Sequence, residues 1–170
     1  DDEQYRQEIE CDPNAAIKGT YYSKIIAQME ADGRIGHFPY NPNELVYVAA
    51  DLGFTDSCAW WFWQLDEHGP ILIDYFEDDS EKLDHYIEML EAKPYEYAEV
   101  WLPHDGTATS FQTGRSTIEQ MIDAGLPCRP VPKLARQHGI DATRKVLKTT
   151  RIDKAHCEDG IEALRAYRRQ

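Results

Sequence analysis

Two acidic residues stand alone at the ends of apolar runs, where a carboxylate needs a physical reason. Asp51 follows the run VYVAA, and Asp105 follows VWLPH. A carboxylate at the end of a buried strand is costly unless a metal ion or a basic partner compensates it, or a turn exposes it to water. If the fold brings these two acids together, their repulsion requires that one protonates or that a cation sits between them. Hard oxygen ligands favour Mg²⁺ or Mn²⁺ as that cation.

The chemistry that suits such a pair is two-metal hydrolysis of a phosphodiester. One ion activates water, the other stabilises the leaving oxygen, and the ions, about 3.5 to 4 Å apart, share a bridging carboxylate. We assign Asp51 as the bridge and Asp105 as a ligand of one ion. Asp56 is a weaker candidate ligand, because a turn residue bonded to nearby backbone is the more natural interpretation of it. His104 is expected to lie behind the ligands or to face solvent, since neighbours in a strand point to opposite faces.

Hydrophobic patterning predicts the elements that must position these acids. Strands are predicted at ELVYVAADL, which ends at Asp51, at SCAWWFWQLD, at ILIDYFEDD after the turn HGP, at YAEVWLPHD, which ends at Asp105, and at CRPVP. Helices are predicted over residues 21–31, 80–92, 116–124, 138–149 and 154–168. Gly125 is expected to end the third of these helices.

This order of elements indicates a fold class. Three antiparallel strands, a helix, a strand, a helix, a strand and then helices form the ribonuclease H-like α/β fold, in which helices flank a mixed central sheet. The first and fourth strands lie side by side and parallel in that topology, so their carboxyl ends meet. We therefore expect Asp51 and Asp105 at one edge of the sheet, where the small residues of DLG and HDG let a substrate approach the backbone.

Length and composition indicate the number of domains, the state of the cysteines and the absence of a membrane-spanning segment. A chain of 170 residues suits one α/β domain with a proper core. Its four cysteines show no CxxC spacing, which favours reduced thiols over a disulfide framework or a zinc site. No run approaches the roughly 20 apolar residues that cross a bilayer, and no leader pattern opens the chain. We expect a soluble, intracellular protein that does not bind membranes.

The charge is unevenly distributed along the chain. The net charge of −13 argues at first against nucleic acid as a partner, because phosphate binding usually leaves an excess of basic residues. Residues 129–170, however, carry +6 and residues 1–128 carry −19. On charge alone, a pair of solvated helices that balances the acidic body is the favoured interpretation.

The tryptophans of the second predicted strand have two interpretations. Trp60 lies on one face of that strand, and Trp61 and Trp63 lie on the other. They could stack on bases, but aromatic residues on a central strand are usually core, and we favour core.

Several blocks of the sequence resemble one known family. YVAADLGFTDSCAWWFWQ, AEVWLPHDGT, RIDKAHCEDGIEALRAYRR and the earlier YRQEIECDPNAAIKGTYYSKIIAQMEADGRIGHFPYNP are similar to parts of the C-terminal nuclease domain of the large terminase subunit of tailed bacteriophages and of the segment before it. The resemblance implies a Mg²⁺- or Mn²⁺-dependent endonuclease, with two ions, that cuts concatemeric viral double-stranded DNA during genome packaging. It implies that Asp51 and Asp105 are metal-binding acids.

The resemblance also implies partners and a location. The partners are double-stranded DNA, the terminase ATPase domain, the portal and the small terminase subunit, in the host cytoplasm. Because the family binds DNA, four basic residues become candidate phosphate contacts, namely Arg144, Lys145, Lys148 and Arg151.

The chain departs from the family in two respects. It contains no GxxxxGK[ST] loop, so no ATPase domain or activity is expected in it. We assign residues 1–40 to a linker or arm and residues 41–170 to the nuclease domain. The family's third acid lies on a last helix with a pattern like Ser-His-x-x-Asp-Ala, beyond the block that resembles EALRAYRR, so the domain is expected to be truncated before it. His156 and Asp159 match part of that pattern, but we expect Asp159 to be a surface acid near a helix start rather than a ligand.

Two alternatives remain open at this stage. The same fold and acid geometry serve Holliday-junction resolvases and transposases, and a junction enzyme would prefer branched DNA. A non-enzymatic alternative is an assembly module that docks on other packaging proteins through its acidic body and cuts nothing.

Overall fold

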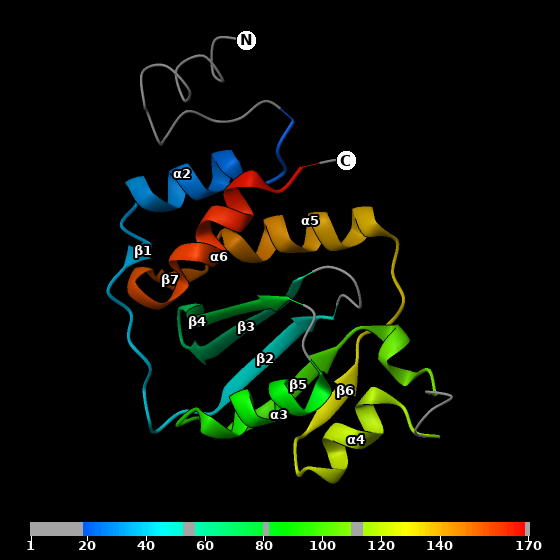
Figure 1. The fold of residues 1–170 in the computed structure, drawn as a ribbon. Coiled ribbons are helices and arrows are strands. Elements are labelled where there is room, and N and C mark those ends of the chain that lie inside the picture. The colour runs from blue at the N-terminus through cyan, green and yellow to red at the C-terminus, as the bar shows by residue number, and fades with distance from the viewer. Residues whose placement is uncertain (1–18, 53–56, 80–81, 110–113, 169–170) are drawn as a thin grey trace. The chain divides into compact units, whose positions relative to one another are not determined.

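The computed structural model, drawn in Figure 1, describes residues 19–52, 57–79, 82–109 and 114–168. Its strands form one mixed sheet. The strands are β1 (Ile35–Gly36), β2 (Val46–Asp51), β3 (Ser57–Asp66), β4 (Gly69–Asp79), β5 (Tyr97–Leu102), β6 (Cys128–Pro130) and β7 (Arg151–Asp153). The helices are α2 (Ser23–Ala31), α3 (Leu83–Ala92), the 3₁₀ turn η1 (His104–Thr107), α4 (Thr117–Asp123), α5 (Arg136–Leu147) and α6 (Lys154–Ala166).

The sheet has seven strands in the order β1-β7-β4-β3-β2-β5-β6. The run β4-β3-β2-β5-β6 is the predicted arrangement, with β2 antiparallel to β3 and parallel to β5. The ribonuclease H-like fold class is therefore confirmed. The short strands β1 and β7 extend the sheet beyond what the sequence pattern predicted.

The described residues group into two compact units. The first unit contains the described residues up to Pro39, the segment Asp66–Ile73 and the residues from Ala135 onward. The second unit contains Tyr40–Leu65 and Asp74–Leu134. Both candidate acids, Asp51 and Asp105, belong to the second unit.

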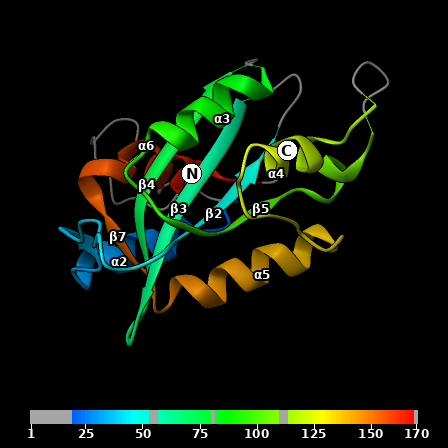
Figure 2. The same ribbon diagram turned by 90° about the horizontal axis from the view of Figure 1, so that it is seen from below.

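The core of the second unit lies on one face of its strands. Val48 on β2 pairs in register with Phe62 on β3, and both side chains are fully buried. Trp60, one alternate position away on β3, is also fully buried, and its ring lies 5.5 Å from that of Tyr86 on α3. Helix α3 runs along these strands in the view from below (Figure 2). The core assignment of Trp60 is therefore confirmed.

The opposite face of these strands carries half-buried aromatic residues. Tyr47 stacks on Trp63 with ring centroids 5.9 Å apart, and Trp61 lies 4.6 Å from Tyr75 of β4. The predicted alternation of the tryptophans along β3 is observed, but Trp61 and Trp63 are only partly covered, so their assignment to the core was wrong.

A buried polar network holds the end of α3 in the second unit. Lys93 Nζ lies 2.6 Å from Asp74 Oδ2, which also accepts a 2.9 Å hydrogen bond from the Tyr95 hydroxyl. Lys93 further lies over the ring of Phe62, 5.0 Å from its centroid. Burial, together with the neighbouring Asp74 charge, raises the pKa of the Tyr95 hydroxyl well above its usual range. The tyrosine therefore stays protonated and serves as a donor to Asp74.

The first unit is built around β7, which pairs in parallel with β1 and with the start of β4. Ile152 at its centre is fully buried. Arg34, which precedes β1, donates from Nη1 to the carbonyls of Leu147 and Thr150 at 2.7 and 3.1 Å, and so holds the end of α5. Arg165 of α6 contacts Glu30 of α2 at 2.8 Å.

Segments from opposite ends of the described chain lie side by side in the first unit. The Tyr21 amide donates a 2.9 Å hydrogen bond to the Tyr167 carbonyl, and Thr20 forms an antiparallel bridge with Arg168. The ring of Tyr22 stacks on that of Tyr167, with centroids 5.6 Å apart. We call this contact, formed by residues 20–22 and 167–168, the terminal clasp.

Two further expectations concern cysteines and membranes. Cys58, Cys128 and Cys157 are buried and form no disulfide among the described residues. Within the described part of the chain, no helix combines the length and the apolar character that a bilayer crossing requires.

Candidate metal centre

Asp51 and Asp105 are carried by neighbouring parallel strands of the second unit. Ala49 of β2 is in register with Trp101 of β5, and both strands run in the same direction past this point. Asp51 is the last residue of β2, and Asp105 lies three residues after the end of β5. Both acids therefore extend from the same edge of the sheet, and both are exposed to solvent.

The connection to Asp105 differs from the predicted strand. β5 ends at Leu102 because Pro103 follows with φ −53°, and residues His104–Thr107 form the 3₁₀ turn η1 instead. Asp105 is in the first turn of η1, and its carbonyl accepts a 2.9 Å bond from the Ala108 amide. The prediction of a strand that continues to Asp105 was wrong, although the acid remains at the predicted edge.

The glycines of DLG and HDG were expected to let a substrate approach the backbone, and the structure assigns Gly106 a different role. Gly106 is buried, and a Cβ atom on it would lie 3.6 Å from Ile118 Cγ1, in ordinary contact. Gly106 thus faces the interior and packs against α4, rather than opening the backbone to a substrate. Gly53 of the DLG motif lies outside the described residues.

The donor set at this edge fits a hard cation. Two exposed carboxylates offer oxygen ligands, and Mg²⁺ commonly uses one or two protein carboxylates while it keeps several waters. Burial raises the pKa of the β6 thiol of Cys128 to about 11, so it stays protonated and is unsuited to metal binding. No group of three or more His, Cys, Asp or Glu side chains suited to a metal occurs among the described residues. Within that part of the chain, the edge thus presents two ligand candidates and no third.

The other predicted site residues have different outcomes. Asp56 lies outside the described residues. Asp159 is exposed on α6 in the first unit, as expected of a surface acid. His104 is exposed, and its ring makes no hydrogen bond or ion pair with residues that the structure describes.

The four basic candidates fall into two groups. Arg151 pairs with Asp66 and lies over the ring of Phe38, so its guanidinium is engaged within the fold. Arg144 donates to the Tyr21 carbonyl at 3.2 Å and lies 3.4 Å from Asp141. Both arginines therefore have structural roles in the first unit.

Lys145 and Lys148 form the second group. Both are exposed on α5 or at its end, and neither side chain makes a hydrogen bond or ion pair with the part of the chain that the structure describes. At i and i+3 they lie on one side of the helix. Their ammonium groups are available to an external anion.

The structure also shows a buried acid that the sequence analysis did not single out. Asp153, 1% exposed, precedes α6; its Oδ1 accepts from the Phe38 amide at 2.9 Å, and its Oδ2 lies 2.6 Å from His156 Nδ1. Burial raises the pKa of this carboxyl, but the bonds to His156 and Phe38 outweigh it, so the pKa is lowered overall. The signal for it was present in IDKAHC, an acid directly before a helix with a histidine three residues later.

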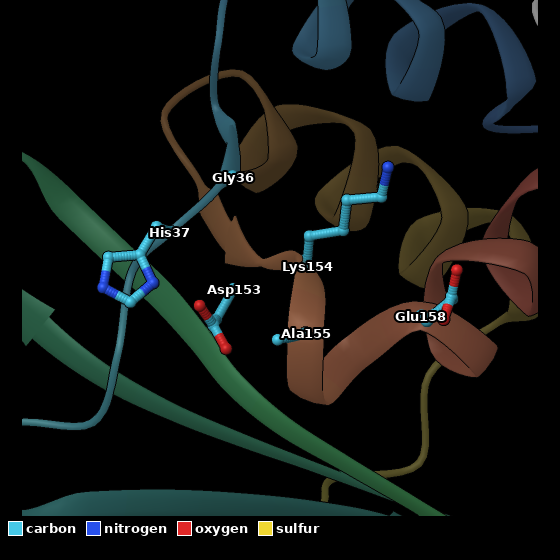
Figure 3. Close-up of a pocket in the computed structure, with 6 residues that line it drawn as sticks. All are labelled: Gly36, His37, Asp153, Lys154, Ala155 and Glu158. Carbon is cyan, nitrogen blue, oxygen red and sulfur yellow. The ribbon is translucent and has the colours of Figure 1, made fainter.

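A pocket of about 400 Å³ lies beside Asp153, in the first unit (Figure 3). Its walls come from the end of β1 and the residue after it, and from the junction of β7 with α6. The lining residues are Gly36, His37, Asp153, Lys154, Ala155 and Glu158. Both oxygens of Asp153 already have a partner, the Phe38 amide and His156.

Comparison with known proteins supports the fold. No protein-family model and no curated protein matches the sequence. Among solved structures, the nuclease domain of the P22 large terminase aligns with a TM-score of 0.61 at 19% identity, covering 81% of this chain and 76% of that one. The large terminase nuclease of thermophilic phage G20c with bound magnesium aligns with a TM-score of 0.60 at 13% identity, covering 89% and 82%.

A longer protein aligns as well. The large terminase of another thermophilic bacteriophage gives a TM-score of 0.67 at 13% identity, with 88% of this chain covered and 38% of that one. At these identities the similarity shows the fold, which is the ribonuclease H-like fold found in large terminase nucleases.

Proposed function

We propose that this chain is a metal-dependent endodeoxyribonuclease that cuts concatemeric viral double-stranded DNA during genome packaging. The observation that carries the proposal is the parallel pairing of β2 with β5, which leaves Asp51 and Asp105 exposed at one edge of the sheet. The fold shared with terminase nucleases supports the substrate and the biological setting.

Each acid has a defined part in this proposal. Asp51, at the end of β2, would serve as the ligand shared by the ions, and Asp105, on η1, would hold one of them. Asp56 is a weaker candidate for a further ligand, and Asp159 is a surface acid. Two Mg²⁺ or Mn²⁺ ions, when bound, would activate water and stabilise the leaving oxygen of a phosphodiester. The G20c nuclease has been solved with magnesium and with cobalt, which supports a divalent ion at this fold.

Lys145 and Lys148 are the proposed contacts to the DNA backbone. Their exposed positions and their lack of partners among the described residues distinguish them from Arg144 and Arg151. Phosphate contacts of this kind fix the position of a duplex without reading its sequence. We therefore infer cleavage with little sequence preference.

The proposed setting includes other packaging proteins. The longer terminase that aligns with this chain has been solved with ATP-γ-S and with ADP. We infer that the nuclease acts together with a terminase ATPase domain, a portal and a small terminase subunit in the host cytoplasm.

Plasmid cleavage tests the proposal directly. The chain should nick or cut supercoiled plasmid when Mn²⁺ is added, and chelation should stop the reaction. Asp51→Asn and Asp105→Asn should each abolish cleavage, whereas Asp159→Asn, a matched change of an exposed acid, should leave it intact. A strong preference for four-way junctions over linear duplex would instead indicate a junction resolvase. Absence of both cleavage and metal binding would indicate an assembly module.

A further inference from the structure

We propose that Arg129 anchors a phosphate of the DNA strand beside the edge that carries Asp51 and Asp105, and that Glu99 and Trp101 position its guanidinium. This inference rests on the proposed nuclease function. It concerns only the second unit, to which all five residues belong.

The strand register places Arg129 on the same face of the sheet as Asp51. Ala49 of β2 is in register with Trp101 of β5, and Trp101 is in register with Arg129 of β6. Residues in register on neighbouring strands share a face, and so do residues two apart on one strand. Asp51 is two residues beyond Ala49, so it shares this face with Trp101 and Arg129. The buried side chains of Val48 and Val100 occupy the opposite face.

The guanidinium of Arg129 is held from one side only. Its Nε lies 3.2 Å from Oε1 of Glu99, and the other carboxylate oxygen, Oε2, accepts a 3.1 Å hydrogen bond from the Trp101 indole. The indole thereby fixes the carboxylate, and the carboxylate fixes Nε. The Arg129 side chain is nevertheless 61% exposed. Its two terminal nitrogens have no partner within the described residues.

This arrangement suits a phosphate. A guanidinium presents its donors as a planar fork that matches phosphate oxygens, and less is lost on binding when the fork is already oriented. Trp101, which holds the carboxylate, is half-buried. The pair of Arg129 with Glu99 differs from an ordinary surface ion pair, because the Trp101 indole also holds the Glu99 carboxylate.

The backbone separation from Asp51 is that of a neighbouring phosphate rather than the one being cleaved. Arg129 is two strand spacings from Asp51 across the sheet, roughly 10 Å, and about 7 Å along it. With a rise of about 3.4 Å per nucleotide along one strand, this distance corresponds to a phosphate a few nucleotides from the metal centre. Arg129 is therefore assigned to holding the substrate, and not to the chemical step.

Binding without metal provides the first test. The affinity of the chain for a fluorescein-labelled duplex of mixed sequence is measured by anisotropy in chelator over a range of salt concentrations. Arg129→Ala should weaken binding about tenfold and lower the salt dependence by about one counterion. Arg129→Lys should retain the salt dependence but recover only part of the affinity, because an ammonium is a point charge without a fork.

Arg115→Ala is the matched control. Arg115 is also an exposed arginine of the second unit that pairs with a carboxylate, that of Asp123, and its side chain is 57% exposed. It lies just before α4 and not on the sheet face. Its removal should change the affinity less than twofold, and an equal effect of both changes would show a general charge effect and overturn the inference.

Kinetics provide the second test and separate the two proposals. With Mn²⁺, Arg129→Ala should raise KM for plasmid while kcat stays near that of the unchanged chain, and Glu99→Gln should shift KM in the same direction by a smaller factor. If the unchanged chain cuts DNA but Arg129→Ala leaves both affinity and KM unaltered, this inference is wrong and the nuclease function stands. If the unchanged chain neither binds nor cuts DNA, the proposed function fails and this inference fails with it.

Discussion

The ammonium nitrogen of Lys93 lies 2.6 Å from Oδ2 of Asp74, and the two side chains are only 21% and 11% exposed. Lys93→Met keeps the aliphatic stem over Phe62 but leaves Asp74 buried without its charge partner. We expect a loss of about 3 kcal/mol in the free energy of unfolding, because an unpaired buried charge is strongly destabilising. Urea denaturation measures it. Arg115→Ala, which breaks an exposed pair, should cost at most about 1 kcal/mol; equal losses in the two variants would contradict a special role for Asp74.

The two acids of the candidate metal centre should act together in Mn²⁺ binding. Asp51→Asn should remove most of the binding because it removes the bridging ligand, and Asp105→Asn should weaken binding substantially. Isothermal titration calorimetry with Mn²⁺ measures both changes. Asp159→Asn serves as the control, since this exposed acid lies on α6 in the other unit. Unchanged affinity in Asp51→Asn, or loss of affinity in Asp159→Asn, would show that the ligands have been wrongly assigned.

The free lysines of α5 should contribute to DNA affinity without contributing to the fold. Lys145→Gln combined with Lys148→Gln should lower the salt dependence of duplex binding by about two counterions. The thermal midpoint of this double variant should stay close to that of the unchanged chain, because neither lysine side chain has a partner among the described residues. Lys24→Gln, which removes one exposed charge from α2, is the single-site control and should have little effect. A lowered midpoint in the double variant would indicate that these lysines are structural after all.

Asp153 should make the stability of the chain sensitive to acid. Its pKa in the folded state is lowered from 3.8, so the stabilisation that it provides is complete above pH 3.8 and is lost as the pH falls through the lower folded pKa. Asp153→Asn keeps an acceptor for the Phe38 amide but cannot titrate. The difference in urea midpoint between the two proteins should therefore be largest near neutral pH and shrink in acid. If the difference in urea midpoint grew as the pH fell, the charged form of Asp153 would not be the stabilising one, and the lowered pKa would be wrong.

The sequence predicted the central strands well because their patterns are long and regular. SCAWWFWQLD contains a long, unbroken run of apolar and aromatic residues, and the structure has β3 over the same residues, Ser57–Asp66. β1 and β7 contain only two and three residues, which is too short for any alternation to be seen. Their parallel pairing depends on packing between distant segments, and a local pattern carries no information on it.

The sequence also predicted part of the candidate site. The position of Asp51 and Asp105 at one edge follows from strand order alone. The end of β5 was misplaced because the strand pattern was extended through Pro103, whose ring cannot donate to the ladder. Which basic residues are free could not be read from the chain, since the partner of Arg151 is Asp66, 85 residues away in sequence. Only the folded structure distinguishes such an arginine from an exposed lysine.

The terminal clasp has a mechanical consequence. Because Thr20 lies against Arg168 and the Tyr21 amide bonds to the Tyr167 carbonyl, a pulling force applied to the segments on either side of this contact acts first across the clasp itself. The tension passes from residue 20 to residue 168 within the first unit, and it does not run through β2 or β5. A load on the flanking segments therefore has to break the clasp before it reaches the strand ends that carry Asp51 and Asp105.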